Sequence, residues 1–217
     1  MKKGNGENKN SGLFNWLYED NGKYRNKKGE LEKDAMRYTL GSCSNDICSK
    51  VLVCVGVNPS SAIPGDLDKT VERVKNKSIS EKYDAWVMLN LYPQRATEPK
   101  NIDEEFDKKE HKKNVAAIEA LFRKIKDNDI DCTIWAAWGD PITTRRFLYQ
   151  TCLPDIVDVT KKVGKYEWVC LGKTNKLNPY HPSPRGKEKG FIFNPFQPFE
   201  IEAYLEKSLP PIMQSNI

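Results

Sequence analysis

Continuous apolar runs alternate with amphipathic stretches through the middle of the chain. Four of these runs are rich in β-branched and aromatic residues, and each ends in turn-forming or polar residues. Runs of this kind are typical of strands that are buried on both faces of a parallel sheet. The four predicted strands are VLVCVG (51–56), DAWVMLN (84–90), CTIWAAWG (132–139) and YEWVCLG (166–172).

Helical patterns separate these strands. Residues 68–83 have a charged outer face, and residues 107–127 interleave charged side chains with apolar ones at helical spacing. A third helix is predicted to open with residues 141–152, because proline is favoured in the first turn of a helix. Residues 36–43 have the pattern of a further strand, and residues 194–209 predict a closing helix.

The alternation of strand and helix predicts the fold class. The economical arrangement is an α/β three-layer sandwich, with helices on both faces of a central, mostly parallel sheet of four or five strands. The polar, glycine- and asparagine-rich residues 1–12 predict a flexible tail. No clear domain break follows, so residues 13–217 are expected to form a single domain.

Composition narrows the class of protein. The chain has 217 residues, of which 38% are hydrophobic, and a formal net charge of +5. No apolar run has membrane-spanning length, and no apolar core follows the basic start, so we expect a cytoplasmic monomer with no membrane partner. The modest positive charge is compatible with a phosphate-bearing partner such as DNA.

The six cysteines do not form a recognisable metal site. In a cytosolic chain they should stay reduced. Cys43 and Cys48 are five residues apart, but no second close pair completes a set of four ligands. We therefore predict neither a metal nor another cofactor.

Polar and turn-forming residues gather after the predicted strands, at 57–70, 90–99, 138–141 and 178–186. Ligands bind beyond the carboxyl ends of parallel strands, so these loops are expected to meet at one rim. The last loop holds His181, one of only two histidines, in a frame stiffened by prolines. This placement favours a functional His181 over a structural loop histidine.

Short motifs in these loops resemble the uracil-DNA glycosylase superfamily. VGVNPSSA (55–62) is similar to its first motif, in the form of the mismatch-specific branch, and HPSPRG (181–186) is similar to the second. MLNLYP (88–93) resembles the strand that ends in a base-reading asparagine, and IWAAWGDP (134–141) the strand that ends in Trp-Gly. Residues 38–186 also resemble a bacterial and phage family known only as a domain of unknown function. The resemblance implies a uracil-DNA glycosylase-like fold.

The same resemblance implies catalytic roles for His181 and Asn58. A glycosylase flips a nucleotide out of the stack and breaks the bond between base and sugar, which leaves negative charge on the base. A neutral His181 imidazole would donate to a base carbonyl, and Asn58 would orient the attacking water, although an amide cannot deprotonate it. The alternatives are a structural loop histidine and an Asn-Pro turn without a catalytic role.

Asp66 and Asp68 could supply what Asn58 lacks. One of them could act as the general base or stabilise the sugar cation. Asp68 could equally cap the helix that is predicted to begin near Lys69, and capping is the role expected for one of the two.

Two further residues are candidates for binding the base. Asn90 stands where the resemblance places a base-reading asparagine, and its alternative is a strand-end residue that bonds the nearby loop. Arg95 has no counterpart in the glycosylase motifs, but it could grip a phosphate or a substituent on an unusual base. Its alternative is a solvated arginine.

Small residues of the loops suit contacts with DNA phosphates, because they let backbone amides approach. The candidates are Ser60, Ser61, Ser183 and Gly186, although turns alone would favour the same residue types. Arg185 stands where the glycosylases have a leucine that fills the gap left by the flipped base. An arginine can stack in that gap too.

Together these residues favour a monofunctional DNA glycosylase that acts on a flipped-out uracil or modified pyrimidine, including hypermodified bases of phage type. Such an enzyme would serve DNA repair or antiviral defence. Two alternatives stay open: a non-catalytic sensor of a nucleotide or modified nucleic acid on the same rim, and a hydrolase of small nucleosides or nucleotide-sugars. An aspartate at position 58 would have distinguished the glycosylase from the two alternatives, but the chain has asparagine there.

Overall fold

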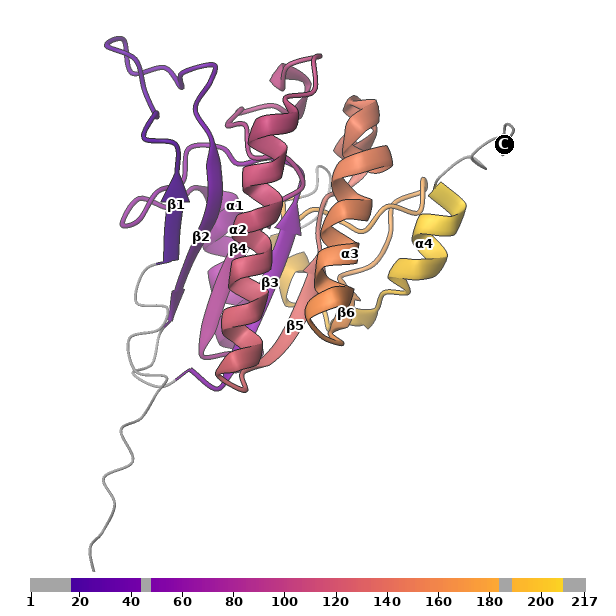
Figure 1. Cartoon of the computed structure of the whole chain (residues 1–217). Coiled ribbons are helices and arrows are strands. Elements are labelled where there is room, and N and C mark those ends of the chain that lie inside the picture. The colour runs from indigo at the N-terminus through magenta and orange to yellow at the C-terminus, as the bar shows by residue number, and fades with distance from the viewer. Residues whose placement is uncertain (1–16, 44–47, 184–188, 209–217) are drawn as a thin grey trace, which may run out of the picture.

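A computed structural model describes residues 17–43, 48–183 and 189–208 of the chain, and one seven-stranded sheet runs through them (Figure 1). The strand order is β1-β2-β4-β3-β5-β6-β7. The strands are β1 (Leu17–Asp20), β2 (Arg37–Cys43), β3 (Lys50–Gly56), β4 (Ala85–Asn90), β5 (Asp131–Ala136), β6 (Glu167–Cys170) and β7 (Gln197–Pro198). The tail predicted at residues 1–12 lies outside the described residues.

The four predicted buried strands form the parallel centre of the sheet. β3 pairs in parallel with β4 on one side and with β5 on the other, and β5 pairs in parallel with β6. The sheet is wider than the predicted four or five strands, because antiparallel strands extend both edges. β1 and β2 add to the β4 side and β7 adds to the β6 side.

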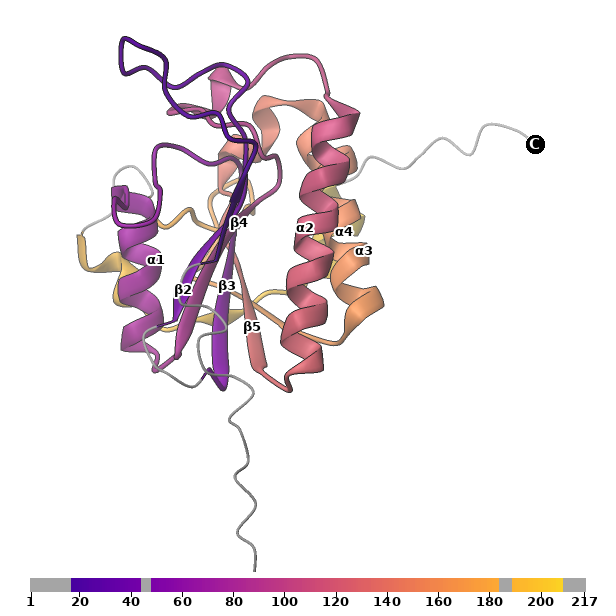
Figure 2. The same cartoon turned by 60° about the vertical axis from the view of Figure 1, so that its left-hand side comes forward.

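Helices cover both faces of the sheet, as predicted, and complete an α/β fold of three layers. They are α1 (Lys69–Ser80), α2 (Lys108–Asp127), α3 (Leu153–Val163) and α4 (Ile201–Ser208). Figure 2 shows α1 on one side of the sheet and the other three helices on the opposite side. Apolar side chains pack between the helices and the sheet on both faces. Val71 and Val74 of α1 pack against Trp86 and Trp135 on one face. Ile118 and Phe122 of α2 pack with α3 on the other face.

The helix predicted to open within residues 141–152 opens at residue 146 and not at the proline. A 3₁₀ turn (Asp140–Thr144) comes first, and the helix from residue 146 then passes through a π-helical turn (Leu148–Cys152) into α3. Arg145 between the two turns has extended backbone angles. Its guanidinium donates to the carbonyls of Lys100 and Ile102, at 2.7 and 2.6 Å, and these bonds hold the chain away from a continuous helix.

The carboxyl ends of the parallel strands bring the polar loops to one edge of the sheet. Gly56 at the end of β3 lies opposite Asn90 at the end of β4. Because β2 runs antiparallel to β4, the first residue of β2, Arg37, arrives at this same edge. None of the described helices is long and apolar enough to cross a membrane.

Candidate active site

A cleft of about 880 Å³ opens at this edge of the sheet. All four predicted loops contribute to its lining, through Asn58, Thr97, Trp138 and His181 among others. We call six of its buried lining residues the cleft floor: Arg37, Gly56, Val57, Val71, Met88 and Trp138. The prediction that these loops converge on one rim is confirmed.

His181 lines the cleft as a neutral hydrogen-bond donor. The backbone amide of Ser183 donates to its Nδ1 at 3.1 Å, so the ring proton of the neutral imidazole must sit on Nε2. Burial of the ring lowers the pKa of His181 to about 4. The positive charge of Arg73 also lowers this pKa, whereas the negative charge of Asp68 raises it. At neutral pH the ring therefore presents an uncharged Nε2–H group, for which no described residue is recorded as an acceptor.

Glycine at position 139 allows this histidine to sit where it does. Gly139 has a φ of 61°, and a Cβ atom there would lie 3.3 Å from the Cβ of His181. Its backbone amide donates to the carbonyl of Pro179 at 2.9 Å, which ties the loop after β5 to the His181 loop. The glycine of the Trp-Gly motif thus adopts the backbone conformation of the turn and leaves room for the side chain of His181.

Buried polar bonds fix these two loops further. The indole Nε1 of Trp138 donates to the Tyr204 hydroxyl at 3.2 Å, and that hydroxyl donates to Asn178 at 2.7 Å. Asn178 and Thr174 both donate to one carboxylate oxygen of Asp140, at 2.8 and 2.6 Å. The chain of bonds fastens α4 and the loop after β6 to the cleft floor.

Asn58 lines the cleft with its amide oxygen unengaged. Its Nδ2 donates to the carbonyls of Ala96 and Pro59, at 2.8 and 3.0 Å, which fixes the orientation of the side chain. No described residue is recorded as donating to Oδ1. Because both donors of the amide point to protein carbonyls, Asn58 offers a fixed acceptor to the cleft.

Asp68 caps α1 and also lines the cleft. Its Oδ1 accepts from the backbone amides of Thr70 and Val71, both at 3.0 Å, and so caps α1. The same side chain lines the cleft, and no described residue is recorded as donating to Oδ2. Asp66, in contrast, is exposed and outside the cleft lining, in a turn closed by backbone bonds with Ile63.

Asn90 is fully buried and lies next to the cleft, outside its lining, and its predicted role in reading a base stays a prediction. In the amide orientation that gives both side-chain atoms a partner, it donates to the Asn58 backbone carbonyl at 3.1 Å and accepts from Arg37 Nη2 at 3.2 Å. These bonds are those expected of the alternative, a strand-end residue that bonds the nearby loop. Asn90 holds two lining residues in place from below.

Arg95 is also buried and outside the cleft lining, so the alternative of a solvated arginine is wrong, while its predicted contact with a phosphate or an unusual base stays a prediction. Its Nη1 donates to the carbonyls of Ser60 and Ala62, at 2.6 and 3.2 Å. Nη2 donates to the Tyr18 hydroxyl at 2.8 Å, and the guanidinium lies over the Tyr24 ring. These contacts turn Arg95 inward to support the loop after β3.

The small residues divide between the cleft and its support. Ser60 and Ser183 line the cleft, and the Ser183 hydroxyl lies 3.4 Å from that of Thr70. Ser61 is outside the lining, and its carbonyl accepts from the Tyr24 hydroxyl at 2.6 Å. Arg185 and Gly186 lie outside the described residues, so their predicted contacts with DNA stay predictions.

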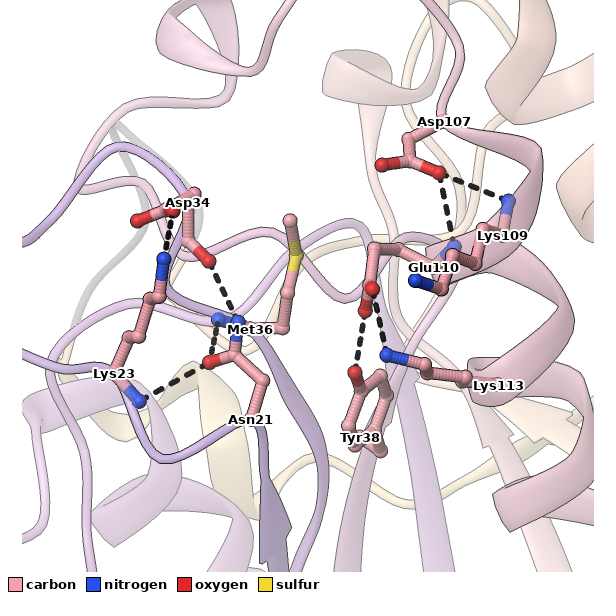
Figure 3. A network of polar contacts seen from close by, with 9 residues as sticks. All are labelled: Asn21, Lys23, Asp34, Met36, Tyr38, Asp107, Lys109, Glu110 and Lys113. Atoms are coloured by element: carbon pink, nitrogen blue, oxygen red, sulfur yellow. Dashed lines mark hydrogen bonds and ion pairs between the residues drawn. The ribbon is translucent and has the colours of Figure 1, made fainter.

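Sequence reasoning missed Arg37. This residue lies in the cleft floor and is 1% exposed. Bonds on both sides hold its strand in place: Asn21 Oδ1 accepts from the Met36 amide at 3.0 Å, and the Tyr38 hydroxyl donates to Glu110 of α2 (Figure 3). The one signal in the sequence was an arginine inside a predicted strand, at a position whose neighbours are apolar.

The described residues contain no group of three or more His, Cys, Asp or Glu side chains arranged to hold a metal ion. The lining offers instead a neutral imidazole, a fixed amide oxygen, a carboxylate and a buried guanidinium. This set can donate hydrogen bonds to developing negative charge and accept them from a water.

The chain has no match among the curated proteins or among the solved structures that were compared. One family model matches it, described as a protein of unknown function (DUF1643), over residues 37–183. The matched range begins at Arg37 and ends at Ser183, and so includes the described residues that line the cleft. Because the match spans more than half of the 217 residues, the chain belongs to the DUF1643 family.

Proposed function

We propose that the protein is a DNA glycosylase that hydrolyses the N-glycosidic bond of a flipped-out uracil or modified pyrimidine. The observation that supports this most is the fixed, neutral Nε2–H donor of His181 in a cleft with Asn58 and Asp68. A donor that is uncharged and already oriented suits an oxygen whose negative charge develops only during the reaction.

The proposed reaction assigns each group one task. The electron pair of the bond between C1′ of the sugar and the base nitrogen goes to the base, where His181 stabilises the resulting charge on a carbonyl oxygen. Asn58 Oδ1 accepts a hydrogen bond from the water that adds to C1′. The proton lost by this water goes to Asp68 Oδ2, which also stabilises the cationic sugar.

Asp68 supplies the proton acceptor that Asn58 cannot provide. An amide can orient a water but cannot take its proton, so a site with Asn58 alone would be slow. Because helix capping engages only Oδ1 of Asp68, the second oxygen of that carboxylate is available for the proton. Asn58 thus orients the water and Asp68 accepts its proton, two tasks that a single catalytic aspartate could perform.

The size of the cleft supports a substituted base. Ligand pockets commonly measure about 300 to 1,000 Å³, and 880 Å³ is near the upper end. Its floor includes the apolar side chains of Val71, Met88 and Trp138, which suit the face of a base. We propose DNA as the partner and a pyrimidine with a substituent as the preferred target.

Release of free base from DNA tests the proposal. The full chain would be incubated with genomic DNAs that carry different natural base modifications, and with uracil-containing DNA, and released bases would be identified by mass spectrometry. We expect one modified pyrimidine or uracil to appear, with an abasic site left in the strand. DNA that is bound but loses no base in any of these substrates would contradict the glycosylase and favour a sensor.

A further inference from the structure

We propose that Arg37 in the cleft floor binds an anionic group of the ligand, a carboxylate or a phosphate, through its guanidinium. The inference rests on the proposed function only in taking this cleft as the substrate site, and it concerns binding, not bond cleavage. Four observations on the described residues support it.

The first observation is the cost of burying this charge. Arg37 is 1% exposed, and burial lowers the pKa of its guanidinium to about 9, with the charge of Arg95 adding to the effect. The side chain is still protonated at neutral pH. A buried charge is expensive unless a charge of opposite sign compensates it, so an arginine kept here needs a partner.

The second observation is that the protein does not supply this partner. No carboxylate of the described residues forms an ion pair with Arg37 within 4.0 Å. Asp68 acts on Arg37 only at longer range, and its Oδ1 already accepts the two amides that cap α1. The positive charge of Arg95 makes the environment of Arg37 more positive still.

The third observation is the hydrogen-bond inventory of the guanidinium. Nη1 donates to the Ala62 carbonyl at 3.1 Å and Nη2 to the Asn90 side chain at 3.2 Å, while Nε has no partner among the described residues. A guanidinium has five N–H donors, and Nε with one Nη forms a fork that matches two oxygens of a carboxylate or phosphate. The unused Nε–H is one prong of that fork.

The fourth observation is that Arg37 is held rigidly. The bonds of Asn21 to Met36 and of Tyr38 to Glu110 fix the strand on both sides of it (Figure 3), and its own backbone amide donates to the Pro93 carbonyl at 2.9 Å. A guanidinium that is already oriented loses little freedom on binding, which favours affinity. Two neutral acceptors, the Ala62 carbonyl and the Asn90 side chain, hold the Arg37 guanidinium in position, and neither compensates its positive charge.

Arg95 provides a matched control within the same protein. It is buried to the same degree, at 2% exposed, it shares the Ala62 carbonyl with Arg37, and its Nε likewise has no partner among the described residues. Arg95, however, lies outside the cleft lining, and the Tyr24 ring lies against its guanidinium. A ligand in the cleft should therefore depend on the charge of Arg37 and not on that of Arg95.

Calorimetric titration with two pairs of probes tests the inference. Orotate against uracil adds a carboxylate to a pyrimidine, and deoxyuridine monophosphate against deoxyuridine adds a phosphate. We expect at least one anionic probe to bind more tightly than its neutral partner, and the successful pair identifies the group. Arg37→Met should weaken that probe by about 10- to 100-fold, as expected for the loss of a charged hydrogen bond. Arg95→Met should leave the preference for the anion unchanged.

A second readout follows Arg37 in the unaltered protein and needs only a conservative variant, which keeps the positive charge, for assignment. The Nε–H resonance of Arg37 in the unaltered protein, assigned with Arg37→Lys, should shift on addition of the favoured anionic probe and not on addition of its neutral partner. The inference is overturned if both anionic probes bind no better than their neutral partners, or if Arg37→Met keeps the preference. Base release is measured separately, so anion binding without release would contradict the proposed function alone.

Discussion

The backbone amide of Ser183 donates to Nδ1 of His181 and thereby sets which ring nitrogen carries the proton. Because the Ser183 amide can only donate, Nδ1 must accept, and the proton of the neutral ring is confined to Nε2. The three residues from His181 to Ser183 thus present a donor of defined direction and charge. The prolines on either side restrict the backbone that holds it.

The ionisation of His181 should be visible in solution. Burial lowers its pKa to about 4, below the usual value of 6.5, so its ¹⁵N resonances should stay those of a neutral ring with the proton on Nε2 down to about pH 4. With only two histidines in the chain, His181→Gln assigns the signals. A ring that titrates near pH 6.5 would contradict the donor state proposed here.

The same shift should affect stability. Between pH 6.5 and about 4 the unfolded chain protonates His181 and the folded chain does not, so the free energy of unfolding should fall as the pH falls through this window. The contribution of His181 is then constant below about pH 4. His181→Gln should remove this part of the pH dependence, as measured by urea denaturation at several pH values.

Gly139→Ala should disturb the His181 loop. The substitution places a Cβ 3.3 Å from that of His181 at a φ of 61°, which L side chains rarely adopt. Gly65→Ala is the control, since Gly65 has a φ of 81° and nothing within 4 Å of its Cβ position. Both variants should lose about 1 kcal/mol of stability from backbone strain, but only Gly139→Ala should shift the His181 resonances. Equal effects on His181 would contradict the contact.

Asp68 variants should separate capping from charge. Asp68→Asn keeps an oxygen that can cap α1, whereas Asp68→Ala should cost about 1 kcal/mol of stability as an N-cap loss. If the carboxylate also serves the reaction, both variants should release base more slowly, although only one is clearly destabilised. Base release by Asp68→Asn at the rate of the parent would restrict Asp68 to the cap.

The strands and the rim were predictable because both follow from local patterns. Residues 51–56 are apolar on both faces of the strand, and this local pattern alone predicts that the strand is buried between two helical layers. The convergence of the loops then follows from parallel pairing. The helix predicted to open at Pro141 starts later, because Arg145 bonds the carbonyls of Lys100 and Ile102 and has extended backbone angles.

Polar residues at the ends of strands were harder to place. Asn90 and Arg95 stand at positions where a side chain could point into the cleft or under it, and the choice depends on carbonyls and hydroxyls far along the chain, such as Tyr18. Arg37 alternates with apolar neighbours, which predicts a solvent-facing side chain. It is buried because the loop after β3 covers it, through the Ala62 carbonyl.

The most direct test of the central claim is single-turnover release of base from a DNA oligonucleotide that contains the preferred base, with DNA binding measured separately. His181→Ala should release base on the order of 100- to 1000-fold more slowly than the parent, because it removes one donor to the charge of the transition state, while its affinity for DNA changes little. His111→Ala is the control, since His111 bonds Asp155 at 2.7 Å and is outside the cleft lining. His181→Ala that releases base as fast as the parent would contradict the account.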